Sequence, residues 1–168
     1  MLVMEVHVQT RGELRPDPQH DPIRAIFYTL TCDGPTFQQE TGIVVVGENI
    51  LKGTGITVGA VHHVPDEASL FQKMIEFIRL WDPDILAGYE IEMHSWGYLI
   101  QRGYVFETNL LTEIGRTNEE NPSWKEANAS DSQNLEFDDA PKNIRHMRIP
   151  GRIILDIWRL LRHEVSTD

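Results

Sequence analysis

Residues 82–103 read DPDILAGYEIEMHSWGYLIQRG, and this stretch decides the fold because it joins a short apolar run to an amphipathic segment through a glycine. The apolar run ends at Gly88 and is typical of a buried strand. A helix is expected over about 93–102. Two acids and a histidine lie between the two elements, and they raise the question of a metal site or an acid–base pair: Glu90, Glu92 and His94.

The segments before this stretch predict strands followed by one helix. Residues 2–9, LVMEVHVQ, alternate between apolar and polar side chains, which predicts a strand with one buried face. Further strands are expected at 23–32, 41–47 and 56–64, where β-branched residues are frequent. Between the first two strands, RGELRPDPQHDP has the prolines of a turn-rich connection.

The clearest predicted helix lies in PDEASLFQKMIEFIRLWDPD, residues 65–84. Asp66 is a suitable N-cap, and the dipeptide Asp82-Pro83 is expected to end the helix. Its apolar face recurs at helical spacing and consists of Leu70, Phe71, Met74, Ile75, Phe77, Ile78 and Trp81. The order strand, helix, strand, helix predicts a mixed sheet with helices packed on it.

Residues 115–150 are polar and show little periodicity, so we interpret them as an insertion or loop within the domain. The acidic residues Glu136, Asp138 and Asp139 fit a solvated loop. Order is expected to resume in GRIILDIWRLLRHEV, residues 151–165, as a strand to about Leu155 and a helix from Asp156.

Composition bounds the function classes. The 168 residues fit one domain, 1–168, and the net charge of −11 argues against tight, autonomous binding of nucleic acid. The single cysteine, Cys32, excludes an internal disulfide and a cysteine-rich zinc site. No apolar run is long enough to span a membrane, and the N-terminus lacks the pattern of a signal peptide. A strand that begins at once suggests a fragment.

Several side chains allow both a functional and a structural interpretation. Glu90 and His94 could bind a metal ion, but a local ion pair or a solvated helix start is favoured. Glu92 is expected to be exposed. His62 and His63 should point to opposite faces of a strand and so cannot readily bind one ion together. Core positions are favoured over a base-stacking platform for Trp96, Tyr98 and Leu99, and core positions are also expected for Trp81 and Trp158.

Three stretches carry a resemblance to a known family. RGELRPDP after the first strand, DPDILAGYEIEMHSWGYLIQRG and GRIILDIWRLLRHEV resemble the exonuclease domain of B-family DNA polymerases in order and spacing, over nearly the whole chain. The runs EVHVQTRG and MHSWGYL are most similar to the zeta branch of that family. The resemblance implies an α/β fold of the ribonuclease-H-like, 3′–5′ exonuclease type, a mixed sheet flanked by helices that would be incomplete at the C-terminus here.

The resemblance also implies where metal ligands would stand. Proofreading members hold two metal ions with carboxylates, from an Asp-x-Glu on the first strand and an Asp in the stretch quoted first. This chain has Glu5 and His7 at the first two positions. Where the family has an Asn followed five residues later by the Asp, it has Glu90 and Ser95. The family's last acidic motif would lie beyond residue 168.

These departures predict that the exonuclease positions Glu5, His7, Glu90 and Ser95 form no intact catalytic site. Serine is neutral, and imidazole suits softer metals better than magnesium. Glu5 and His7 could capture a transition metal if Asp156 came near, so these three are the candidate metal ligands. No cofactor is expected in this chain; the resemblance implies magnesium in the parent polymerase, and zinc or an iron–sulfur cluster far downstream.

The resemblance implies a nuclear, error-prone DNA polymerase that extends past lesions, with template–primer DNA and accessory polymerase subunits as partners and no membrane partner. The domain would then be structural and would help to position DNA. Two alternatives remain open. One is a divergent exonuclease that uses Glu5, His7, Glu90 and Asp156 with a softer metal. The other is a module that docks a partner protein through the insertion 115–150.

Overall fold

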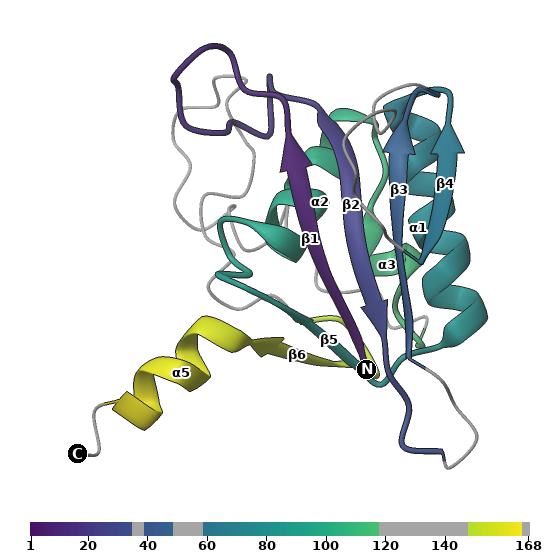
Figure 1. Cartoon of the computed structure of the whole chain (residues 1–168), viewed down its shortest axis with the longest axis vertical. Helices are drawn as coiled ribbons and strands as arrows, with labels where there is room; N and C mark the ends of the chain where they lie inside the picture. Colours follow the sequence, from purple (N-terminus) through teal and green to yellow (C-terminus); the bar gives the residue numbers. More distant parts are fainter. Residues whose placement is uncertain (35–38, 49–58, 118–147, 166–168) are drawn as a thin grey trace, which may run out of the picture.

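The computed structural model describes residues 1–34, 39–48, 59–117 and 148–165, and these residues build a mixed sheet with helices against it (Figure 1). The strands run in the order β4-β3-β2-β1-β5-β6. Their bounds are β1 Leu2–Val8, β2 Ile23–Leu30, β3 Glu40–Val46, β4 Ala60–Val64, β5 Ile85–Gly88 and β6 Ile153–Asp156. The expected mixed sheet is therefore confirmed, with the strand predicted at 56–64 described from Ala60 onward.

The register of β1 explains its alternating sequence. β1 pairs antiparallel with β2 from Leu2↔Leu30 to Val8↔Ile23, and an irregularity follows His7. On the other side β1 pairs parallel with β5 over two positions, Leu2↔Leu86 and Val3↔Ala87. Leu2 and Met4 are buried in the core, whereas Glu5 is half-buried and His7 is exposed. The predicted period of two is confirmed, and it places Glu5 and His7 together on the face opposite the core.

Helix α1 (Glu67–Trp81) begins and ends where its sequence predicts. The Asp66 carboxylate accepts the Ser69 amide at 2.8 Å, and Asp82 adopts a left-handed conformation as the C-cap. Its buried side chains form one face against the sheet: Leu70, Phe71, Met74, Ile75, Phe77 and Ile78. Trp81 is half-buried and packs against that core, so its prediction as a core residue is confirmed in part.

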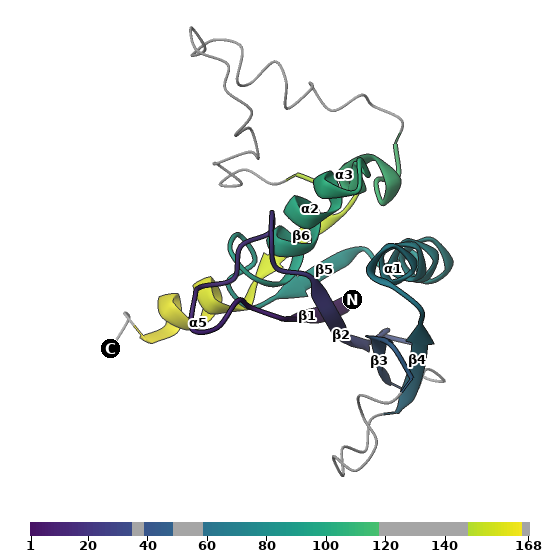
Figure 2. The ribbon, with the colours of Figure 1, turned by 90° about the horizontal axis from the view of Figure 1, so that it is seen from above.

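Helix α2 (Ser95–Val105) starts two residues later than predicted and runs past Arg102, and the short α3 (Leu110–Glu113) after it was not predicted. Trp96, Tyr98 and Leu99 are all at most 1% exposed, which confirms their core positions. α1, α2 and α3 lie on the same side of the sheet, while α5 (Ile157–Val165) leaves the β6 edge and extends away (Figure 2). Among the described residues, no helix is long and apolar enough to cross a membrane.

A buried ion pair fixes the connection 11–22 against both long helices. Arg102 binds the Glu67 carboxylate at 3.0 and 2.9 Å and donates to the carbonyls of Pro18 and Gln19. Glu67 also accepts the Ile23 amide at 2.7 Å. The connection after β1 is therefore held in a defined position beside the end of the strand that carries Glu5 and His7.

Within that connection, Asp21 is fully buried and hydrogen bonded. Its carboxylate accepts the Arg11 guanidinium at 2.8 Å and the Asp17 amide at 3.0 Å. Burial alone raises the pKa of Asp21, but these hydrogen bonds outweigh it and lower the pKa of the carboxyl. The Tyr98 hydroxyl donates to the Asp21 carbonyl at 2.8 Å, which ties α2 to the same connection.

A second cluster joins the described residues that flank the segment 118–147. Arg116 binds Asp82 and Asp84, and its amide donates to the Pro150 carbonyl at 2.9 Å. Arg152 donates to the carbonyls of Ile114 and Pro83. The residues on either side of this segment therefore lie next to each other. Most of the predicted insertion 115–150, with Glu136, Asp138 and Asp139, lies outside the described residues, so its role as a docking loop stays a prediction.

We predict that Arg102→Ala lowers the free energy of unfolding by about 3–5 kcal/mol, because it leaves the mostly buried Glu67 carboxylate without its cation. Chemical denaturation monitored by circular dichroism measures the change. The exposed pair Arg79–Glu113 provides a matched control, and Arg79→Ala should cost less than about 1 kcal/mol. Equal effects of the two substitutions would contradict the structural role given to Arg102.

Candidate functional site

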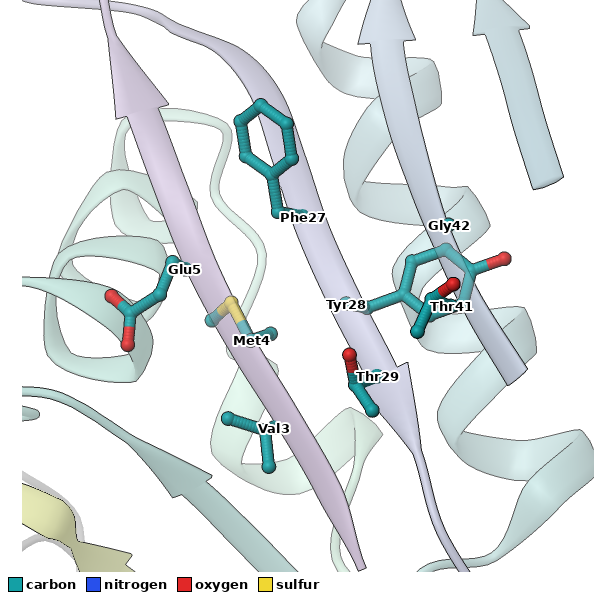
Figure 3. Close-up of a pocket in the computed structure, with 8 residues that line it drawn as sticks. All are labelled: Val3, Met4, Glu5, Phe27, Tyr28, Thr29, Thr41 and Gly42. Carbon is teal, nitrogen blue, oxygen red and sulfur yellow. The ribbon is translucent and has the colours of Figure 1, made fainter. Parts of the chain in front are cut away.

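The candidate site lies where the β1–β5 ladder ends. Here Glu5 of β1 adjoins the turn that carries Glu90 and leads to Ser95. The Glu5 carboxylate accepts the backbone amide of Tyr89, the first residue after β5, at 2.7 Å. Figure 3 shows the Glu5 side chain pointing from β1 away from β2. One oxygen of the carboxylate is therefore engaged by the main chain.

Ser95 is completely buried at the first position of α2, where its φ is 45°. Its hydroxyl donates to the carbonyl of Met4, the residue before Glu5, at 2.7 Å. A Cβ on Gly88 would lie 2.0 Å from the Ser95 hydroxyl oxygen, so only glycine allows this approach. The Ser95 side chain therefore points into the protein interior and is hydrogen bonded to the backbone of β1.

Neighbouring contacts hold the start of α2 in place. The Trp96 indole donates to the Ala87 carbonyl of β5 at 2.9 Å. A Cβ on Gly97 would lie 2.3 Å from the carbonyl oxygens of Ile91 and Glu92, so the turn before the helix presses directly on its first residues. These contacts make Ser95 and Trp96 two adjacent attachments of α2, one to β1 and one to β5.

Burial, one backbone hydrogen bond and two ionisable groups act on Glu5 at this point. Burial raises the pKa of Glu5, while the Tyr89 hydrogen bond and the nearby His94 act in the opposite direction. The Asp156 carboxylate adds to the rise, and the net pKa lies above its ordinary value. Asp156 comes near because it pairs with Gly88 in the β5–β6 ladder. The structure therefore brings Glu5, His94 and Asp156 within electrostatic reach of one another.

Each of the acids after β5 lies beside a basic side chain, Glu90 beside His94 and Glu92 beside Arg159. His94 lies 3.3 Å from the Glu90 carboxylate, as the ion-pair interpretation predicts, although the two residues stand in a turn rather than on a helix. Glu92 was predicted to be exposed, and this is wrong: its side chain is 28% exposed and binds Arg159 of α5. The sequence could not show this contact, because it joins residues 67 positions apart.

Asp156 and His7 complete the set of predicted site residues. The Asp156 carboxylate accepts the Trp158 amide at 3.0 Å and lies 3.7 Å from Arg159. His7 is exposed on β1. His62 and His63, the adjacent pair, face opposite ways as predicted: His62 meets the Tyr28 hydroxyl at 3.0 Å, and His63 meets the Gly47 carbonyl at 2.8 Å.

The donor set does not fit a pair of magnesium ions. Magnesium requires several free, hard oxygen ligands in a tight octahedron. Ser95 offers a buried neutral hydroxyl that already donates to a carbonyl, and one oxygen of Glu5 is occupied by an amide. Across the described ranges, no three or more His, Cys, Asp or Glu side chains are grouped so that they could hold a metal ion.

A shallow hollow on the sheet adjoins Glu5 but adds no further ligands. It is lined by Val3, Met4, Glu5, Phe27, Tyr28, Thr29, Thr41 and Gly42 (Figure 3). Glu5 is its only carboxylate, and Figure 3 shows that side chain at the margin, pointing away from Phe27 and Thr29. The hollow is therefore a surface of the sheet beside the site.

One aromatic prediction is wrong and reveals a contact that the sequence did not indicate. Trp158 was expected in the core, yet it is 36% exposed because α5 extends beyond the sheet edge. Its ring packs against Tyr89, with centroids 5.5 Å apart, and the Arg162 guanidinium lies 5.8 Å from it. The apolar spacing of α5 predicts an amphipathic helix but cannot show which face remains open.

Comparisons with known proteins agree with this geometry. A family model described as DNA polymerase family B, exonuclease domain, matches residues 2–168. The DNA polymerase zeta catalytic subunits of Mus musculus and Homo sapiens are each 36% identical to this chain, over 99% of it and 6% of their own length. The DNA polymerase delta catalytic subunit of Caenorhabditis elegans is 26% identical, over 95% of this chain and 14% of its own.

These matches confirm both the family resemblance and the fold class inferred from the sequence, an α/β exonuclease-type fold with a mixed sheet. The two runs that resemble the zeta branch agree with the zeta subunits among the matches. The chain spans only 6% to 14% of the length of the relatives named above.

We predict that Asp156→Asn lowers the pKa of Glu5, because the substitution removes a nearby negative charge while an amide oxygen can still accept the Trp158 amide. His94→Ala should raise the pKa of Glu5, since it removes a nearby positive charge. A carboxyl carbon-13 titration measures both shifts. Asp33→Asn, beyond the far end of β2, serves as the control, and an unchanged Glu5 titration in Asp156→Asn would contradict the cluster.

Proposed function

This chain belongs to the exonuclease-domain family of B-family DNA polymerases, and we propose that it is a non-proofreading member within an error-prone, translesion polymerase of the zeta type. In this proposal the domain braces the polymerase and helps to position template–primer DNA, while it hydrolyses no phosphodiester bond itself. The parent polypeptide would be a nuclear, DNA-directed DNA polymerase that uses magnesium elsewhere and works with accessory subunits.

The observation that carries this proposal is the state of Ser95. The family resemblance places a metal-binding aspartate at this position, and here a buried hydroxyl donates to the Met4 carbonyl instead. Hydrolysis by two metal ions depends on carboxylates that neutralise both ions and hold them a few ångströms apart. With Ser95 turned inward and Glu5 bound to the Tyr89 amide, that clamp lacks its ligands.

The charge balance favours a positioning role within a larger assembly over independent DNA binding. Phosphate neutralisation by lysine and arginine supplies most of the affinity of DNA-binding proteins. This chain has a net charge of −11, and Arg159, one of the cations near the site, is paired with Glu92. Any DNA contact would then depend on a basic groove in the rest of the polymerase.

The chain should remove no 3′-terminal nucleotide in a metal-dependent manner, because its site lacks the required carboxylates. Incubation of the purified chain with a labelled primer–template carrying a mismatched 3′ end, in magnesium and in manganese, should match the EDTA control. A proofreading B-family polymerase is the positive control. Metal-dependent digestion that disappears in Glu5→Ala or His7→Ala would favour the divergent exonuclease and overturn the proposal.

The translesion role requires the full-length polymerase. We predict that it extends a mismatched primer terminus and retains the mismatched nucleotide, because no editing step competes with extension. Sequencing of the extended products measures retention, and a proofreading polymerase on the same substrate provides the contrast. Products in which the terminal nucleotide has been replaced by the matched one would contradict the role.

A further inference from the structure

The parallel ladder between β1 and β5 stops sooner than its strands do. It pairs Leu2 with Leu86 and Val3 with Ala87, although β5 continues to Gly88 and β1 continues to Val8. In a longer parallel ladder, the Met4 carbonyl would accept an amide of the β5 chain just beyond Gly88. Where the ladder stops, the Met4 carbonyl and the Tyr89 amide therefore need other partners.

Side chains supply both partners. The Met4 carbonyl accepts the Ser95 hydroxyl at 2.7 Å, and the Tyr89 amide donates to the Glu5 carboxylate at 2.7 Å. Ser95 and Gly88 are both fully enclosed, and the Ser95 side chain contacts Gly88 directly. One hydrogen bond is thus buried beneath the sheet, while the other lies toward solvent, and together they span the parting of the strands.

Building on the proposed function, we propose that Glu5 and Ser95 form a side-chain bridge that closes the open end of the β1–β5 ladder. Both stand where the family resemblance implies metal ligands. In this chain they satisfy the main chain in place of binding an ion. Glu5 and Ser95 are therefore structural residues here. Their side chains connect β1 to the end of β5 and to the start of α2.

The length of Glu5 is what the bridge requires. The carboxylate crosses from β1 to the Tyr89 amide beyond β5 and accepts it at 2.7 Å. Aspartate, which the family carries, is one methylene shorter and would not reach without a shift of the strand. Glutamine has the length and the carbonyl oxygen of glutamate but no charge, so it can accept the same amide.

The two possible roles of Glu5, metal ligand or bridge, therefore predict opposite outcomes for Glu5→Gln and Glu5→Asp. If Glu5 forms the bridge, Glu5→Gln keeps the stability of the protein and Glu5→Asp loses it. If Glu5 is a metal ligand, Glu5→Asp keeps metal binding and Glu5→Gln abolishes it, because hard cations need the carboxylate charge. The family-like substitution is thus the harmful one under our proposal.

The experiment compares thermal unfolding of the purified chain with Glu5→Gln, Glu5→Asp and Glu5→Ala, each with and without millimolar manganese. We expect Glu5→Asp and Glu5→Ala to lower the midpoint by about 2–4 °C, the shift expected from one lost hydrogen bond in a chain of this size. Glu5→Gln should remain near the wild type. Manganese should shift none of the midpoints.

Hydrogen exchange at the Tyr89 amide provides a local readout that general destabilisation would not reproduce. Exchange should become about fivefold faster in Glu5→Asp and remain slow in Glu5→Gln, since a lost hydrogen bond of the usual strength corresponds to that factor. His7→Gln, on the same face of β1, is the matched control and should leave the Tyr89 amide unchanged. Ser95→Ala should accelerate exchange there as well, because the bridge would lose its buried half.

The proposal is overturned if Glu5→Asp is as stable as Glu5→Gln and protects the Tyr89 amide equally. It is also overturned if manganese stabilises the wild type and Glu5→Asp but not Glu5→Gln. Should Ser95→Ala fail to fold, the Glu5 series decides alone. If the chain shows no nuclease activity and the Tyr89 amide still exchanges slowly in Glu5→Asp, the bridge is refuted while the proposed function stands.

Discussion

The close approach of α2 to Gly88 is the constraint on which the rest of the site depends. Because Gly88 has no side chain, Ser95 can sit against it and reach the Met4 carbonyl, while Trp96 reaches the Ala87 carbonyl beside it. These contacts fix where α2 begins and how far β1 and β5 separate. Because both of its ends are fixed, the turn between Gly88 and Ser95 has a defined path. This path places Glu90, Glu92 and His94 at the same edge of the sheet.

That edge gathers negative charge, and the protein neutralises it with its own groups. Glu90 lies beside His94, Glu92 and Asp156 lie beside Arg159, and Glu5 binds a backbone amide. A metal site leaves carboxylates unpaired so that a divalent cation can neutralise them. Here each carboxylate has a local partner, and the raised pKa of Glu5 reflects its burial more than an unpaired cluster of acids.

Much of the fold could be predicted from the sequence, because the decisive signals are local. The alternation in β1, the apolar face of α1 and the cap at Asp66 each follow from residues within a few positions of one another. Contacts between distant residues were not accessible in this way. The pairing of Glu92 with Arg159 and the exposure of Trp158 both depend on the direction in which α5 leaves β6. The substitution at Ser95 was visible through the family resemblance, but its bond to Met4 was not.

Loss of a metal ligand need not weaken a frame of this kind. Carboxylates that bind two cations repel one another whenever the cations are absent. This repulsion lowers the stability of the metal-free protein, and metal binding offsets it. A serine at position 95 adds no charge and contributes a buried hydrogen bond to β1. Under the proposed function, the serine that replaces a metal ligand would thus also remove a source of repulsion, and its hydrogen bond joins α2 to β1. If the domain braces a polymerase without editing, as proposed, this hydrogen bond would stabilise its fold without a bound ion.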